Sequence, residues 1–154
     1  GNATATASSN ITCRFTPLTA PWSYTGTGEV AGQIERIRSM HVGDRGWGDI
    51  GYHFVVDRAG RIWEARPIRY QGAHVQLQNP GNIGILCLGN FEQQSPSPQQ
   101  LSGLGVLVST LSARHRIPEG RILTHREWST ARTLCPGRNL QSEIDRMRRT
   151  GALA

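Results

Sequence analysis

The spacing of apolar residues along the chain predicts three helices. Ile34, Ile37 and His41 follow one another at steps of three and four, which is the spacing of one helical face. This helix is expected to end near Gly43. Two further stripes with helical spacing are made of Leu101, Leu104, Val108 and Leu111, and of Leu140, Ile144 and Met147.

The start of the second helix carries a capping signal. Ser97 is expected to be its N-cap, and Pro98 occupies the first helical position, where a missing backbone N–H costs little. Gln100 stands three residues after Ser97, so the two residues predict a capping box.

Runs of β-branched and aromatic residues outside these helices predict strands. Residues 52–56 and 61–65 flank the short Gly-containing turn 57–60, which indicates a hairpin. Residues 83–88 are almost wholly apolar, as expected of a strand that is buried on both faces. Two more strands are expected at 11–15 and 121–124.

The interleaving of helices and strands predicts an α/β fold, with a single mixed central β-sheet and helices packed on it. The chain has 154 residues and no internal repeat, which suits one domain with a sizeable core. We expect residues 11–150 to form that domain. Residues 1–10 are small and polar and are expected to form a flexible N-terminal lead-in.

The composition is that of a folded, basic protein. Hydrophobic residues make up 37% and charged residues 18%, and the formal net charge is +6. No apolar run reaches the roughly 18 residues that a membrane span needs. A basic surface favours polyanions, although the charge can also serve solubility alone. Nucleic acid is an unlikely partner, since the chain has neither a stacking array nor a recognised binding module.

The chain has three cysteines and a histidine that could bind metal. An odd cysteine count leaves at least one thiol unpaired, and Cys87, inside an apolar strand, is expected to be a core thiol. His125 and Cys135 stand ten positions apart, and imidazole and thiolate are both good zinc ligands. Spacing alone does not distinguish a metal site from two unrelated residues.

Five short motifs in a fixed order supply the missing context. They are Gly46 to Phe54 (GWGDIGYHF), Gly72-Ala73-His74, Asn82-Ile83-Gly84-Ile85, His125-Arg126-Glu127 and Cys135-Pro136-Gly137. Together they resemble the type-2 N-acetylmuramoyl-L-alanine amidase and peptidoglycan recognition protein family, over roughly residues 11–147. The resemblance implies a central sheet with helices packed on it and a groove that holds the muramyl stem peptide.

The resemblance also implies roles for particular residues. His125 and Cys135 match two of the three zinc ligands of active members, and Tyr52 matches a tyrosine near the zinc-bound water and the scissile carbonyl. Thr133 matches a position near the substrate. In active members zinc would activate water and polarise the carbonyl, and the Tyr52 phenol could donate to the oxyanion. The bond hydrolysed would be the amide between the lactyl group of muramic acid and L-alanine.

Three further residues are predicted to contact substrate: Trp47, His74 and Asn79. Trp47 would stack on the ligand, but a buried tryptophan fits its setting equally well. His74 either lines the groove or hydrogen-bonds to backbone in a loop. Tyr52 likewise has an alternative as a half-buried strand aromatic.

The first strand departs from the family pattern. Active members carry two histidines at its end, whereas this chain places Arg14 at the first zinc-ligand position and Phe15 next to it. Arginine has no acceptor and cannot bind a cation. Another register would let Cys13 supply the third ligand, but a one-residue shift turns a strand's side chains to the opposite face unless a bulge absorbs it.

Two functions therefore stay open from the sequence. The first is a zinc-dependent amidase with an unusual or weakened metal site. The alternative is a non-catalytic peptidoglycan recogniser in which Arg14 pairs with a stem-peptide carboxylate, since arginine suits bidentate carboxylate binding. Either function predicts muropeptides as partners and a secreted, periplasmic or wall-delivered protein. Nothing in the sequence requires a second subunit, so a monomer is expected.

Overall fold

A single mixed sheet forms the centre of the molecule in the computed structural model, which describes residues 10–16 and 22–154. Its strands are β1 (Asn10–Thr16), β2 (Phe54–Val56), β3 (Ile62–Glu64), β4 (Asn82–Leu88) and β5 (Ile122–Thr124). They lie in the order β3-β2-β4-β1-β5, with β3 antiparallel to β2 and the other neighbours parallel. The predicted α/β fold with one mixed sheet is confirmed.

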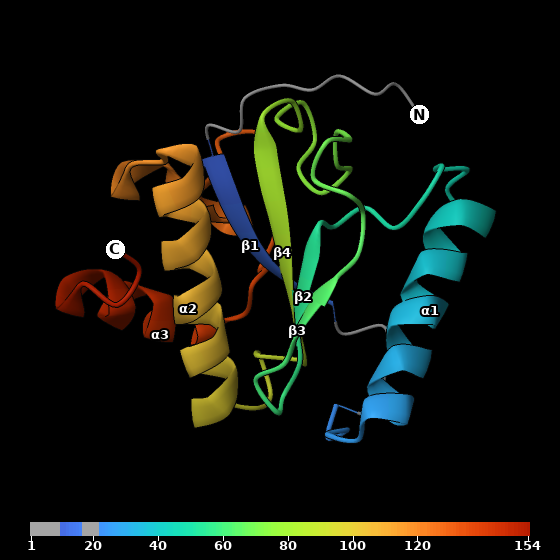
Figure 1. The fold of residues 1–154 in the computed structure, drawn as a ribbon, viewed down its shortest axis with the longest axis horizontal. Helices are drawn as coiled ribbons and strands as arrows, with labels where there is room; N and C mark the ends of the chain where they lie inside the picture. The colour runs from blue at the N-terminus through green and yellow to red at the C-terminus, as the bar shows by residue number, and fades with distance from the viewer. Residues whose placement is uncertain (1–9, 17–21) are drawn as a thin grey trace.

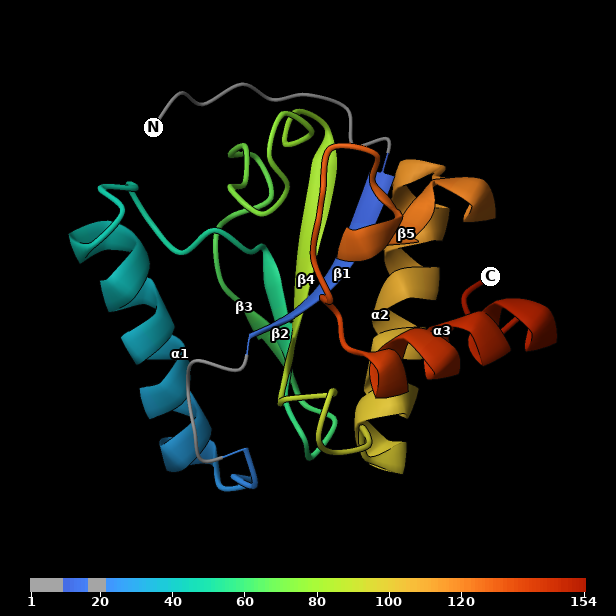
Figure 2. The same ribbon diagram turned by 180° about the vertical axis from the view of Figure 1, so that it is seen from behind.

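The two faces of this sheet are covered by helices (Figures 1 and 2). Within the described residues the α-helices are α1 (Thr27–Gly43), α2 (Pro98–His115) and α3 (Arg138–Thr150), and the 3-10 turns η1 (Glu119–Arg121) and η2 (His125–Glu127) flank β5. Figure 1 shows α1 on one side of the sheet and α2 with α3 on the other. None of the helices in this part of the chain could span a membrane.

The alternation of side chains along β1 separates a core face from a site face. Ile11, Cys13 and Phe15 are buried with the apolar residues of α2 and α3. Because successive side chains of a strand point to opposite faces, Arg14 projects toward the α1 side of the sheet. A smaller apolar cluster on that side includes Val30 of α1 and Leu86 of β4.

The start of α2 differs in part from its prediction. The Ser97 hydroxyl accepts a hydrogen bond from the backbone N–H of Gln100 at 3.0 Å, so the predicted N-cap is confirmed. The capping box is wrong, because the Gln100 side chain is buried and donates to the carbonyls of Val56 at 3.1 Å and Leu88 at 3.0 Å. Gln100 therefore joins the ends of β2 and β4.

The hairpin and the first strand have boundaries that differ from those expected. The paired strands are shorter than 52–56 and 61–65, yet backbone bonds from Ala65 to His53 (2.8 Å) and from Arg66 to Tyr52 (2.9 Å) continue the pairing. Asn10 begins β1 and is not part of a lead-in. The rest of the predicted lead-in, residues 1–9, lies outside the described residues.

Candidate functional site

A cleft of about 650 Å³ opens between the end of β1, the last turns of α1 and the loop around residues 133–135. We call it the β1–α1 cleft. Five of the predicted site residues line it: Arg14, Trp47, Tyr52, Thr133 and Cys135. The fold therefore brings together residues that lie up to 121 positions apart in the sequence.

Arg14 supplies a positive charge inside this cleft. Its Nη1 donates to the backbone carbonyl of His74, and its guanidinium carbon lies 5.5 Å from the centroid of the Tyr52 ring. Its Nε is buried without a hydrogen-bond partner among the described residues. Arg14 is only partly buried and lines the cleft.

Cys135 lies beside the backbone of β1. Its sulfur accepts a hydrogen bond from the Phe15 N–H at 3.3 Å, and its own N–H donates to the Thr133 hydroxyl at 3.1 Å. Burial raises the pKa of the Cys135 thiol, and the positive charge of Arg14 opposes that shift. The group is therefore a thiol near pH 7, and the exposed Thr133 fixes the turn that carries it.

His125 follows β5 and begins η2. Its Nδ1 is buried without a hydrogen-bond partner in the described part of the chain. Burial, and then the charge of Arg14, lower the His125 pKa to about 4, so its imidazole is neutral near pH 7. The positive charge of Arg14 therefore acts on His125, although His125 does not line the β1–α1 cleft.

The side chains at this site do not match a catalytic zinc centre. Such centres take three protein ligands, and Arg14, which the family resemblance places at the first of the three positions, has no lone pair to offer. Cys13 does not replace it, because its side chain is buried in the core on the opposite face of β1. Among residues 10–16 and 22–154, no three His, Cys, Asp or Glu side chains are grouped to hold a metal ion.

Three ring side chains that line the cleft, those of His41, Trp47 and Tyr52, lie next to one another. The His41 ring lies 4.6 Å from that of Trp47 and 5.5 Å from that of Tyr52, between centroids. His41 Nδ1 accepts a hydrogen bond from the Gly51 N–H at 2.9 Å. Burial and the charges of Arg45 and Arg14 lower the His41 pKa to about 4. Nothing in the sequence marked His41 as a site residue, because it shares a helical face with Ile37.

Two residues that were predicted to contact substrate lie away from the cleft. His74 is 2% exposed, and its ring packs so tightly against Gly84 that an added Cβ there would lie 2.7 Å from the ring. Asn79 Oδ1 accepts hydrogen bonds from the N–H groups of His74 and Val75, both at 2.9 Å. Their placement gives both residues a structural role, and their contact with substrate stays a prediction.

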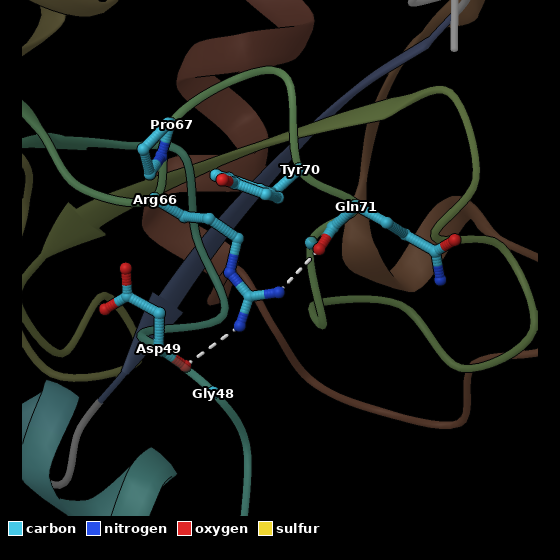
Figure 3. Close-up of a pocket in the computed structure, with 7 residues that line it drawn as sticks. Gly48, Asp49, Arg66, Pro67, Tyr70 and Gln71 are labelled. Carbon is cyan, nitrogen blue, oxygen red and sulfur yellow. Dashed lines mark hydrogen bonds between the residues drawn. The ribbon is translucent and has the colours of Figure 1, made fainter. Parts of the chain in front are cut away.

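A second pocket of about 560 Å³ lies next to the first and is lined by residues 48–49, 66–67 and 70–72. Figure 3 shows the Arg66 guanidinium at its centre, bonded to the carbonyl groups of Asp49 and Gln71. Arg66 Nε also donates to the carbonyl of Ile50 at 2.7 Å. Three Arg66 N–H groups thus donate to backbone, so this arginine fixes two loops, whereas Arg14 makes one hydrogen bond to backbone.

Comparison with known proteins shows the family of the chain. A sequence profile described as N-acetylmuramoyl-L-alanine amidase matches residues 18–138. The chain belongs to this amidase family. Peptidoglycan-recognition protein SC2 of Drosophila melanogaster is 35% identical over 113 residues, which is 73% of this chain. The match spans 60% of the length of that relative.

Solved structures of the amidase family have the same fold. The N-acetylmuramoyl-L-alanine amidase LysC from Clostridium intestinale superposes with a TM-score of 0.74 at 26% identity, covering 94% of this chain and 87% of LysC. Peptidoglycan recognition protein-LE, solved in complex with tracheal cytotoxin, superposes with a TM-score of 0.81 at 27% identity, covering 93% of this chain and 82% of that protein.

Proposed function

We propose that residues 11–150 form a peptidoglycan-binding domain that holds a muramyl group, with or without its stem peptide, in the β1–α1 cleft without zinc-dependent hydrolysis. Membership of the amidase family supports the substrate class. Peptidoglycan recognition protein-LE, whose fold is similar, was solved with tracheal cytotoxin, a monomeric diaminopimelic acid-type peptidoglycan. Peptidoglycan lies outside the bacterial cytoplasm, so the proposal includes a secreted, periplasmic or wall-delivered protein.

The observation that carries this proposal is the position of Arg14. A guanidinium stays protonated at any physiological pH, so it repels a divalent cation at the place where the family's first zinc ligand belongs. His125 and Cys135 remain, but two protein ligands fall short of the usual three. The loss of a metal site thus coincides with the gain of an anion-binding donor.

The cleft residues have distinct roles in this proposal. Arg14 pairs with a ligand carboxylate, because its planar fork favours bidentate contacts. Trp47 offers an aromatic face to the sugar or peptide, and the exposed Thr133 hydroxyl offers a hydrogen bond at the rim. Tyr52 is buried beneath the Arg14 guanidinium and supports it.

The second candidate function is amide hydrolysis. Four residues favour it, because His125, Cys135, Tyr52 and Thr133 match the family pattern of active members. Hydrolysis with zinc would require a third ligand, and the side chains of residues 10–16 and 22–154 form no such three-ligand group. We therefore place it second.

Incubation with muropeptides, with and without added zinc, separates the two functions. Mass spectrometry would follow release of a stem peptide that begins with L-alanine, and calorimetry would measure binding. We expect micromolar or weaker binding, unchanged substrate and no effect of zinc. Zinc-dependent release of the stem peptide would overturn the proposal in favour of hydrolysis, and absence of binding by the folded protein would overturn it altogether.

A further inference from the structure

The charge of Arg14 is not neutralised within the protein. Arg14 forms no ion pair among residues 10–16 and 22–154, although eight other ion pairs are present there. The remaining stretches, residues 1–9 and 17–21, contain no Asp or Glu, so they offer no acidic side chain. A partly buried cation without a counter-ion is unfavourable, and an anionic ligand would relieve it.

The neighbours of Arg14 do not neutralise its charge. One donor is used by the His74 carbonyl, and the Tyr52 ring covers one side of the guanidinium. Cys135 is already engaged by the Phe15 N–H. Arg45 lines the same cleft as a second cation, with its guanidinium carbon 5.2 Å from the Trp47 ring, and Asp44 is the one acidic residue among the residues that line the cleft. The cleft therefore presents excess positive charge.

The two forms of a muramyl group differ in charge at the lactyl carbonyl. In the intact muropeptide this carbonyl belongs to an uncharged amide. When an amidase adds water, the C–N bond breaks, the lactyl group keeps both oxygens as a carboxylate, and L-alanine leaves with the nitrogen as an ammonium group. A carboxylate can accept two charge-assisted bonds from a guanidinium, whereas an amide oxygen makes weaker neutral-acceptor bonds.

We propose that Arg14 makes the β1–α1 cleft select muramyl groups whose lactyl carboxylate is free over those whose lactyl group is still joined to a stem peptide. The chain then binds the product of amide hydrolysis, so it acts after an amidase has hydrolysed the peptidoglycan. This inference rests on the proposed function, because the lactyl group reaches Arg14 only if a muramyl fragment lies in the cleft.

The test compares ligands that differ at one group. The probes are a GlcNAc–MurNAc disaccharide with a free lactyl carboxylate, the same disaccharide with a neutral lactyl N-methylamide, and the disaccharide bearing an intact stem peptide. A free stem tetrapeptide is the fourth probe. Calorimetry with the wild-type chain is expected to rank the carboxylate form about tenfold tighter than the N-methylamide. Added salt should reduce that difference, because screening weakens charge pairing.

Variants of the full chain assign the preference to Arg14. Arg14→Gln is expected to abolish the preference, Arg14→Lys to retain part of it, and Arg114→Gln, at the end of α2 on the opposite side of the sheet, to leave it intact. Thermal melting checks that each variant is folded.

Each outcome separates this inference from the proposed function. If the intact muropeptide binds as tightly as the carboxylate form, or if the preference survives Arg14→Gln, the inference fails while peptidoglycan binding stands. If the free stem tetrapeptide is preferred in an Arg14-dependent way, Arg14 pairs with a peptide carboxylate. The inferred preference for muramyl groups with a free lactyl carboxylate is then wrong. If no probe binds, the proposed function fails as well.

Discussion

The Arg14 guanidinium lies over the Tyr52 ring, with its central carbon 5.5 Å from the ring centroid. The contact joins the end of β1 to the segment that leads into β2, 38 residues later in the chain. A cation over an aromatic face is attracted to the ring, so the pair holds the guanidinium at the mouth of the site.

Replacing Arg14 by histidine should create a zinc site. Arg14→His removes the charge and supplies a third imidazole or thiolate donor beside His125 and Cys135, which completes a ligand set that zinc accepts. We expect stoichiometric zinc by elemental analysis and zinc-dependent cleavage of muropeptides. Arg14→Gln is the control and should bind none. A folded Arg14→His protein that takes up no zinc would show that β1 does not direct this side chain toward the other two.

Truncating Trp47 should weaken binding without unfolding the protein. Trp47 is partly exposed at the cleft, and its loss removes an aromatic face from the ligand. We expect Trp47→Ala to reduce muropeptide affinity about three- to tenfold, the range for one aromatic contact. Val106→Ala, on the exposed face of α2, should leave affinity unchanged. Equal affinities for wild type and Trp47→Ala would place the ligand elsewhere.

Adding one methyl group at Gly84 should destabilise the fold. A Cβ at this position in β4 would lie 2.7 Å from the His74 ring, which is itself enclosed by the sheet. We expect Gly84→Ala to lower the free energy of unfolding by about 1–3 kcal/mol, as in other overpacked cores. Gly32→Ala in α1 meets no atom within 4 Å and should instead stabilise by up to about 1 kcal/mol. Urea denaturation measures both.

The stability of the fold should decline in acid because of His74. Burial, and then the nearby His53, lower the His74 pKa to about 3, below its ordinary value near 6.5. Between these values the unfolded chain binds the proton and the folded chain does not, so stability falls as the pH falls through this window. At pH 4.5 the loss attributable to His74 should be about 2–3 kcal/mol.

The measurement is urea denaturation at pH 7.5 and pH 4.5. His74→Phe keeps a ring of similar size and should lessen the acid-dependent loss, whatever its effect at pH 7.5. His115→Gln, at the end of α2, is the matched control and should retain the loss. An unchanged pH dependence in His74→Phe would mean that His74 titrates normally in the folded protein.

Much of the fold follows from local rules that operate over a few residues. The helical stripes of α1, α2 and α3, the Ser97 N-cap and the buried run of β4 were predictable because side-chain spacing and capping are local properties. The side chain of Gln100 was mispredicted because its partners, the carbonyl groups of Val56 and Leu88, are distant in sequence. Local pattern favoured a capping box, and tertiary contacts decided otherwise.

The sequence by itself determined the family, the order of helices and strands and the presence of Arg14 at the end of the first strand. The tertiary structure decided which side chains meet. It buried Cys13 in the core opposite Arg14, buried His74 beside the hydrogen-bonding side chain of Asn79, and brought His41 into the cleft. These placements depend on contacts such as that between Phe15 and Cys135, 120 residues apart, which form only when the sheet order and the loop paths are set. No periodicity along the chain encodes such a contact, because it arises from packing of the whole domain.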